Sequence, residues 1–189
     1  MWAMKVLKKL SDVANLIIDG KVGVMPTDTI YGLVGQAFNE NAVKRLYDIK
    51  GRESEKVLIM LISDISDIEK YFNVEITDKQ RVFLDNYWPG KVSVGFPASD
   101  GLPRYISRGF SEFTARLPDY KELTDLISKT GPIFATSANI SGQKPVKSIG
   151  EAQNLFGNKV DFYVDGGELL DKPSSVYSLK RDGSFTQVR

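Results

Sequence analysis

PTDTIYGL, at residues 26–33, separates two apolar runs, and this arrangement is the anchor of the predicted fold. Residues 22–25 and residues 33–38 each have the short apolar pattern of a buried strand. The polar residues between them allow two interpretations. They form a structured turn between the strands, or they form a small polar-ligand site to which Thr27, Thr29 and Tyr31 contribute hydroxyl groups.

Helix and strand patterns alternate along the rest of the chain. Apolar residues at helical spacing mark residues 7–17, 43–47 and 123–127, and either Asn39 or Asn41 could cap the second of these helices. Thr77/Gln80 and Ser148/Glu151 have the capping-box pattern that begins a helix. Further strands are predicted at residues 57–62, 91–96, 113–117, 132–136, 160–164, 175–179 and 185–188. Without a repeat or a linker, this alternation predicts a single α/β or α+β domain over residues 1–189 with a mixed sheet.

Composition excludes several classes of chemistry. The 189 residues contain no His and no Cys, which rules out thiol catalysis, His-based triads and thiolate zinc sites. Lys plus Arg number 25 and Asp plus Glu number 24, so the chain does not coat nucleic acid by bulk charge. No apolar run has the length of a membrane span, and residues 1–9 lack the apolar core of a signal peptide. We therefore expect a soluble, cytoplasmic protein without a membrane partner.

Two polar motifs are candidates for binding phosphates. Lys50-Gly51-Arg52 supplies two cations, and Lys56 adds a third shortly before the next predicted strand. Such a cluster is either a solvated basic loop or a site for a polyphosphate. The second motif, TSANISG at residues 136–142, follows a predicted strand. Its Ser137 and Asn139 suit phosphate binding and suit a helix N-cap or Asx turn equally well.

Arg116 interrupts the apolar strand predicted at residues 113–117. Alternation along a strand allows it to point to solvent. If it points inward it needs an anion, and a substrate carboxylate would serve through bidentate pairing.

The ordered series PTDTIYGL, KGR, WPG, ARLP, ATSANISG, DGG, PSSV and a final Arg resembles the YrdC-like family of threonylcarbamoyl-adenylate synthases from about residue 7 to residue 189. The resemblance is to the short, single-domain form. It implies a twisted open α/β sheet flanked by helices, with a deep basic cavity. It also implies condensation of L-threonine, bicarbonate and ATP into L-threonylcarbamoyl-adenylate and pyrophosphate, for N6-threonylcarbamoyladenosine formation in tRNA.

The resemblance also implies roles for individual residues. The nucleotide-binding set comprises Lys50, Arg52, Lys56, Ser137, Asn139 and Arg189. Within this set Lys50 and Arg52 are the expected catalytic residues, because they can neutralise charge that develops on the phosphates. The threonine-binding set comprises Thr29, Arg116 and Ser175. Mg²⁺ is expected only as the companion of ATP, without a metal site in the protein. Glu53, Val57 and Leu61 depart from the common family pattern.

Other functions stay open at this level. The chain could form a carbamoyl-adenylate on another acceptor, or it could be a non-catalytic RNA-binding module with the same fold. For the synthase, the expected partners are ATP, L-threonine, bicarbonate and a downstream tRNA threonylcarbamoyl transferase. Weak direct binding of RNA is a further open property.

Overall fold

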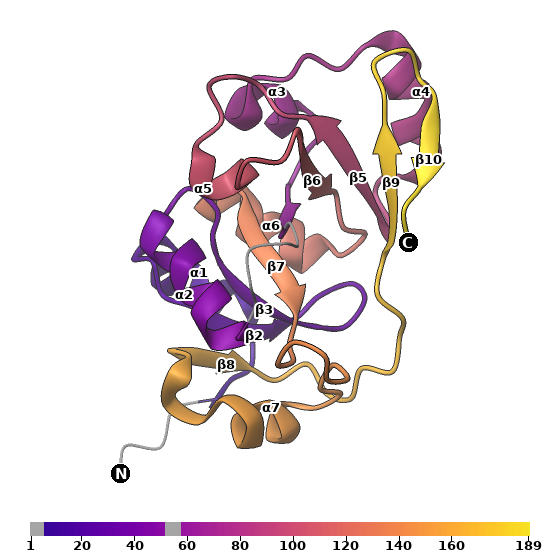
Figure 1. Cartoon of the computed structure of the whole chain (residues 1–189). Helices are drawn as coiled ribbons and strands as arrows, with labels where there is room; N and C mark the ends of the chain where they lie inside the picture. Colours follow the sequence, from indigo (N-terminus) through magenta and orange to yellow (C-terminus); the bar gives the residue numbers. More distant parts are fainter. Residues whose placement is uncertain (1–5, 52–57) are drawn as a thin grey trace.

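The computed structural model describes residues 6–51 and 58–189, and its centre is one ten-stranded sheet (Figure 1). The strand order is β1-β8-β2-β3-β7-β4-β6-β5-β9-β10. The strands are β1 Val6–Leu7, β2 Gly23–Pro26, β3 Tyr31–Gln36, β4 Ile59–Leu61, β5 Val92–Pro97, β6 Glu112–Arg116, β7 Ile133–Ser137, β8 Phe162–Val164, β9 Ser175–Leu179 and β10 Phe185–Gln187. Parallel and antiparallel pairs alternate irregularly, so the sheet is mixed, as the sequence predicts.

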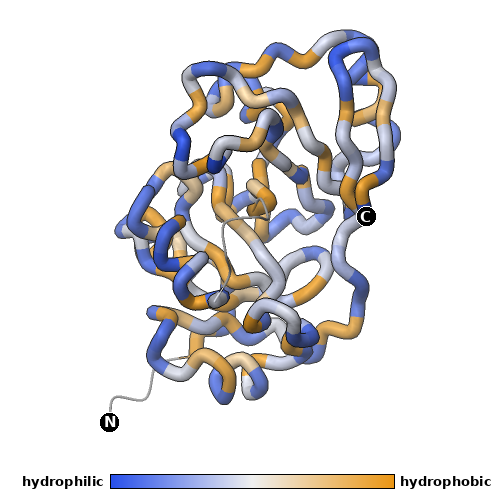
Figure 2. The backbone as a smooth tube through the Cα atoms, viewed as in Figure 1, coloured by the Kyte–Doolittle hydropathy of each residue, from blue (hydrophilic) through white to orange (hydrophobic). Residues whose placement is uncertain are grey.

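Helices cover both faces of this sheet. They are η1 Leu10–Val13, α1 Ala14–Ile18, α2 Glu40–Lys50, α3 Ser66–Phe72, α4 Asp78–Tyr87, α5 Arg104–Ser107, α6 Lys121–Thr130, α7 Ile149–Phe156 and η2 Gly157–Lys159. One core cluster unites side chains of α2, α3, α5 and α7 with one face, and a second unites η1, α1 and α6 with the other. In Figure 2, hydrophobic and hydrophilic segments alternate along the outer helices, because each helix buries one side only.

Side-chain caps begin three of the helices where the sequence places them. Asn39 accepts from the backbone N–H of Ala42 at the start of α2, and Thr77 forms a full capping box with Gln80 at the start of α4. Ser148 accepts from Glu151 N–H at the start of α7. Each cap satisfies a backbone donor that the first helical turn leaves unpaired, which is why these starts could be predicted.

The region predicted as one helix over residues 7–17 is different. Residues 6–7 form β1, which pairs with β8, and a 3-10 turn at residues 10–13 precedes the five-residue α1. Leu10, Val13 and Ile17 are all buried, so the apolar spacing is correctly identified. Because pairing with β8 holds Leu7 in a strand, the helix begins later than predicted.

Aromatic packing holds the end of the chain against the sheet. Phe83 of α4 packs on Tyr177 of β9 and Phe185 of β10, with ring centroids 5.7 and 4.7 Å away. Beyond β10, Val176 N–H donates to the carbonyl of Arg189 at 2.9 Å. Arg189 therefore has a defined place.

Among the residues that the structure describes, no helix is long and apolar enough to cross a membrane.

Candidate active site

A cavity of about 210 Å³ opens where five separate segments of the chain meet. They are the β2–β3 loop, the end of α2, the end of β6, the end of β7 with the loop after it, and the segment before β9. The side chain of Arg189 completes the wall. The described wall residues that matter below are Thr27, Thr29, Tyr31, Lys50, Arg116, Ser137, Asn139, Ser174 and Arg189. Three of these are cations, and no described side chain on the wall is a carboxylate.

The β2–β3 loop is both a structured turn and part of the cavity wall. Thr27 Oγ1 donates to the carbonyl of Ile30 at 2.7 Å and lies 3.0 Å from Thr29 Oγ1. The backbone N–H of Thr29 donates to Thr27 Oγ1 at 3.2 Å. Thr27 and Thr29 are both buried. The two interpretations of this motif are therefore compatible, since the bonds that close the turn also fix the hydroxyls beside the cavity.

Arg116 points inward and faces an acid that the sequence analysis did not pair with it. Its Nη2 lies 3.0 Å from Oδ1 of Asp28, and the two side chains are only 4% and 2% exposed. Its Nη1 lies 3.4 Å from Thr29 Oγ1. Arg116 Nε is buried and has no hydrogen-bond partner among the described residues, whereas burial raises the pKa of the Asp28 carboxyl and backbone N–H groups of Asp28 and Asp119 act to lower it. Asp28 thus balances the charge of Arg116, but not every N–H group of the guanidinium has a hydrogen-bond partner among the described residues.

The electrostatics of this pair follow from its burial. Loss of water raises the pKa of the Asp28 carboxyl above 3.8, and the Arg116 charge only partly opposes that rise. Burial likewise lowers the pKa of Arg116, and the nearby Arg189 charge lowers it further. Two guanidinium groups that repel each other at one cavity form a site that favours an anion between or beside them.

Lys50 ties the end of α2 to the loop after β7. It is 4% exposed. Its ammonium donates to the carbonyl of Ser137 and to Oδ1 of Asn139, both at 2.5 Å, and Ser137 Oγ and the Asn139 carbonyl lie at 3.2 and 3.3 Å. Ser137 Oγ in turn donates to Asn139 Oδ1 at 2.7 Å. The structure therefore brings together three residues predicted for the nucleotide site, and these contacts give Lys50 a role in shaping the loop.

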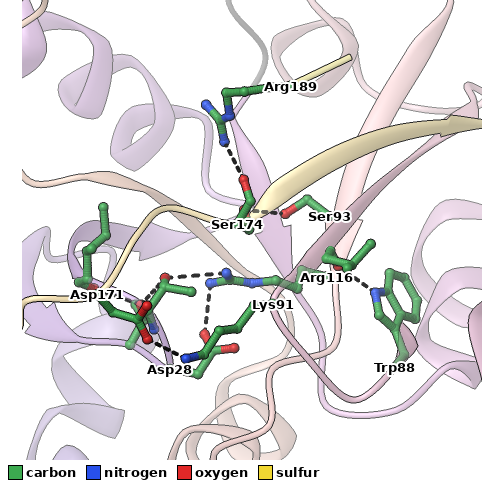
Figure 3. Close-up of polar contacts among 12 residues, drawn as sticks. Asp28, Trp88, Lys91, Ser93, Arg116, Asp171, Ser174 and Arg189 are labelled. Atoms are coloured by element: carbon green, nitrogen blue, oxygen red, sulfur yellow. Dashed lines mark hydrogen bonds and ion pairs between the residues drawn. The ribbon is translucent and has the colours of Figure 1, made fainter. Parts of the chain in front are cut away.

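Arg189 is anchored by the segment that enters β9. Its Nη2 donates to the carbonyl of Ser174 at 3.2 Å, and Ser174 Oγ lies 2.9 Å from Ser93 Oγ in a buried contact (Figure 3).

Ser174 lies on the cavity wall, whereas the predicted Ser175 does not belong to it. Ser175 instead begins β9, and its N–H donates to the carbonyl of Lys91. Neighbouring residues in an extended chain point to opposite sides, so Ser174 and Ser175 face different surroundings, and the threonine-binding role of Ser175 stays a prediction.

Tyr31 connects the cavity wall to the DGG turn. Its hydroxyl donates to the carbonyl of Gly167 at 2.7 Å and accepts from the N–H of Gly166 at 2.9 Å. Gly166 packs so closely on Pro26 that a Cβ atom there would lie 2.6 Å from the proline Cβ. A side chain at residue 166 would push the turn away from the β2–β3 loop.

Several sequence expectations fall elsewhere. Arg52 and Lys56, together with Glu53 and Val57, lie outside the described residues. Leu61 is fully buried in the second core cluster and is absent from the cavity wall. Its departure from the family pattern is accommodated by apolar packing.

Comparison with known proteins supports the expected family. The Sua5/YciO/YrdC family model, described as "Telomere recombination", matches residues 15–189. A threonylcarbamoyl-AMP synthase of Pyrococcus abyssi is 35% identical over 90% of this chain, and one of Yersinia enterocolitica is 31% identical over 94%. This chain spans 51% of the Pyrococcus protein and 95% of the Yersinia protein.

A solved structure agrees with the sequence relatives. P. abyssi Sua5 complexed with L-threonine has a TM-score of 0.88 and 30% identity, covering 98% of this chain and 57% of that one. The mixed α/β fold and the family resemblance inferred from the sequence are thereby confirmed. The chain belongs to the Sua5/YciO/YrdC family.

Proposed function

We propose that this protein is an L-threonylcarbamoyl-AMP synthase, which condenses L-threonine, bicarbonate and ATP into L-threonylcarbamoyl-AMP and pyrophosphate. The observation that carries the proposal is the convergence of Lys50, Arg116 and Arg189 with several hydroxyl groups on one cavity. Cations among small hydrogen-bonding groups suit a substrate pair that brings a carboxylate and a polyphosphate. The names of the relatives point to the same reaction.

The amino acid would occupy the part of the cavity next to Arg116. Its carboxylate would pair with the guanidinium, and the hydroxyls of Thr29 and Ser174 lie on the same wall. This part of the proposal draws support from the structure of P. abyssi Sua5 complexed with L-threonine. Ser174 is our addition to the proposed threonine-binding set, in which Ser175 stays a prediction from the family resemblance.

The nucleotide would lie toward Lys50 and the TSANISG loop. Ser137 and Asn139 offer a hydroxyl and an amide there, and Arg189 adds a guanidinium. The cavity is smaller than the pockets that enclose a drug-sized ligand. We therefore place only the amino acid and the reacting phosphate inside it, with the rest of the nucleotide extending outward. Arg52 and Lys56 remain proposed ATP contacts on the basis of the family resemblance.

The chemistry needs no covalent nucleophile from the protein. The threonine amine would attack the carbon of bicarbonate, forming an N–C bond and releasing water. An oxygen of the resulting carbamate would attack the α-phosphorus of ATP, and the α–β P–O bond would break to release pyrophosphate. The protein's part is to hold the reactants together and to offset charge on the phosphates through Lys50 and Arg52.

Mg²⁺ would enter with the nucleotide. The ion prefers carboxylate and water oxygens, and the described cavity wall offers cations, hydroxyls and an amide instead. No group of three or more acidic, His or Cys side chains in the described ranges could hold a metal. These residues do not fit a protein-held Mg²⁺, so it belongs to the substrate as MgATP.

The product determines the partner that we propose. A threonylcarbamoyl group joined to AMP is a mixed anhydride, activated for transfer to an amine. We infer a tRNA threonylcarbamoyl transferase as its consumer. Direct RNA binding would have to use local charge, since the net charge of the chain is only +1.

Release of pyrophosphate tests the proposed function. The protein is incubated with MgATP, bicarbonate and L-threonine, and each component is omitted in turn. Release should require L-threonine and bicarbonate together, and L-alanine should not replace threonine. Equal release without an amino acid would overturn the synthase, and release with carbamoyl phosphate alone would indicate carbamoyl-adenylate formation instead.

A further inference from the structure

Asp28 lies behind the cavity and not on its wall. Its side chain is 2% exposed, and its nearest charged partner is Arg116, which does line the cavity. Figure 3 shows the Asp28 carboxylate next to the guanidinium, and Lys91, whose charge also acts on Asp28, bonded to Asp171. Asp28 therefore touches the site only through Arg116 and the turn that carries it.

A buried ion pair at this place needs a reason other than stability. Removing two charges from water costs more than their attraction returns in many proteins, and an apolar pair of similar size is often equally stable. Here the hydrogen bonding is also incomplete, because Arg116 Nε has no partner among the described residues. A buried ion pair with incomplete hydrogen bonding, whose arginine lines a cavity, is better explained by an effect on ligand binding.

We propose that Asp28 is a positioning residue for amino-acid binding, holding the Arg116 guanidinium so that its outer N–H groups face a substrate carboxylate. A guanidinium has five N–H groups in a fixed plane. Contact of Nη2 with Asp28 and the approach of Nη1 to Thr29 Oγ1 fix the position of that plane. Arg116 is thus prepared before the ligand arrives, and less ordering is needed on binding.

This inference rests on the proposed function, because it assigns the ligand of Arg116 as the carboxylate of L-threonine. The test compares the affinity for L-threonine with that for L-threoninamide, which lacks the carboxylate, by titration calorimetry. Asp28→Asn keeps the size of the side chain and removes its charge. We expect it to weaken L-threonine binding roughly tenfold, with little change for L-threoninamide or ATP.

Asp161→Asn is the matched control. Asp161 also pairs with a cation, Arg45, and neither residue belongs to the described cavity wall. We expect its L-threonine affinity to equal that of the wild type. If Asp28→Asn does not fold, Asp28→Glu, which moves the charge by one methylene, takes its place with the same expected loss of preference for the carboxylate.

Three results would overturn the positioning role. Equal weakening of L-threonine, L-threoninamide and ATP would make Asp28 a purely structural residue. Unchanged L-threonine affinity would show that Arg116 needs no positioning. Tighter L-threonine binding would mean that Asp28 competes with the substrate for Arg116. Failure of the wild type to bind L-threonine would remove the proposed function as well, and it is distinguishable because it precedes any substitution.

Discussion

The two buried cations of the cavity, Lys50 and Arg116, are equally shielded from water but held in different ways. Each is 4% exposed. The Lys50 ammonium donates to neutral oxygens of Ser137 and Asn139, at short distances and from a helix end. Arg116 faces a carboxylate and lacks full hydrogen bonding. The difference separates a cation that neutral protein oxygens hold beside the proposed nucleotide from one that a buried carboxylate holds beside the proposed amino acid.

The largest expected effect is that of Arg116→Leu. Removing one member of a buried ion pair leaves the other charge without a partner, so the free energy of unfolding should fall by about 3–5 kcal/mol. Binding of L-threonine should be lost as well. Urea denaturation and titration calorimetry measure the two effects.

Asp28→Asn in the Arg116→Leu protein is the control for this prediction. It removes the remaining charge and should restore most of the lost stability. If Arg116→Leu alone is as stable as the wild type, the ion pair is solvated and the contrast with Lys50 disappears.

Lys50→Met should have a smaller effect on stability, of a different kind. Methionine keeps the unbranched chain but leaves the Ser137 carbonyl and Asn139 Oδ1 without the ammonium, at a cost of about 1–3 kcal/mol. Turnover should fall because the phosphates lose a proposed cation and the TSANISG loop loses its anchor, whereas L-threonine affinity should change little. A loss of L-threonine affinity as large as that of Arg116→Leu would show that the two cations share one role.

Arg189→Gln should affect ligand binding without affecting the fold. The backbone of Arg189, not its side chain, pairs with Val176, so the unfolding free energy should stay within about 0.5 kcal/mol. We expect ATP affinity to fall several-fold, as measured by calorimetry, with L-threonine affinity retained. An unchanged ATP affinity would limit the role of this guanidinium to its bond with Ser174.

The smallest effect concerns pH. Because burial raises the pKa of Asp28 above 3.8, the folded protein binds a proton at pH values where the unfolded chain has released it. The contribution of Asp28 to the free energy of unfolding is therefore fully present below pH 3.8, and it is lost as the pH rises through the raised pKa. Relative to Asp28→Asn, the wild type should lose stability on going from pH 3.8 to neutrality. A relative gain would mean that the Arg116 charge outweighs burial.

Local signals account for most of what the sequence predicted correctly. The caps at Asn39, Thr77 and Ser148 act within one helical turn, and residues 175–179 form β9 at the predicted positions. Helix α3 was missed because Ile65, at its N-cap position, makes no cap. The carboxylate of Asp67, inside the helix, instead accepts from the N–H and hydroxyl of Ser63.

Most of the predicted site residues that the structure describes lie on one cavity wall, but their pairing could not be predicted. Thr29, Lys50, Arg116, Ser137, Asn139 and Arg189 all lie on the cavity wall. Asp28 could not be matched to Arg116, because the two are far apart in sequence and meet only when the β2–β3 loop folds beside β6. The choice between Ser174 and Ser175 likewise depended on which side of the chain faces the cavity, and no local pattern determines that.

A crystal structure of the protein with L-threonine tests the central claim most directly. We expect the ligand carboxylate within hydrogen-bond distance of the Arg116 guanidinium, with Asp28 still paired to Arg116 and with Lys50 still bonded to Ser137 and Asn139. A carboxylate bound to Lys50, or bound to Arg116 in place of Asp28, would contradict the division between a cation on the nucleotide side and one that binds the amino acid.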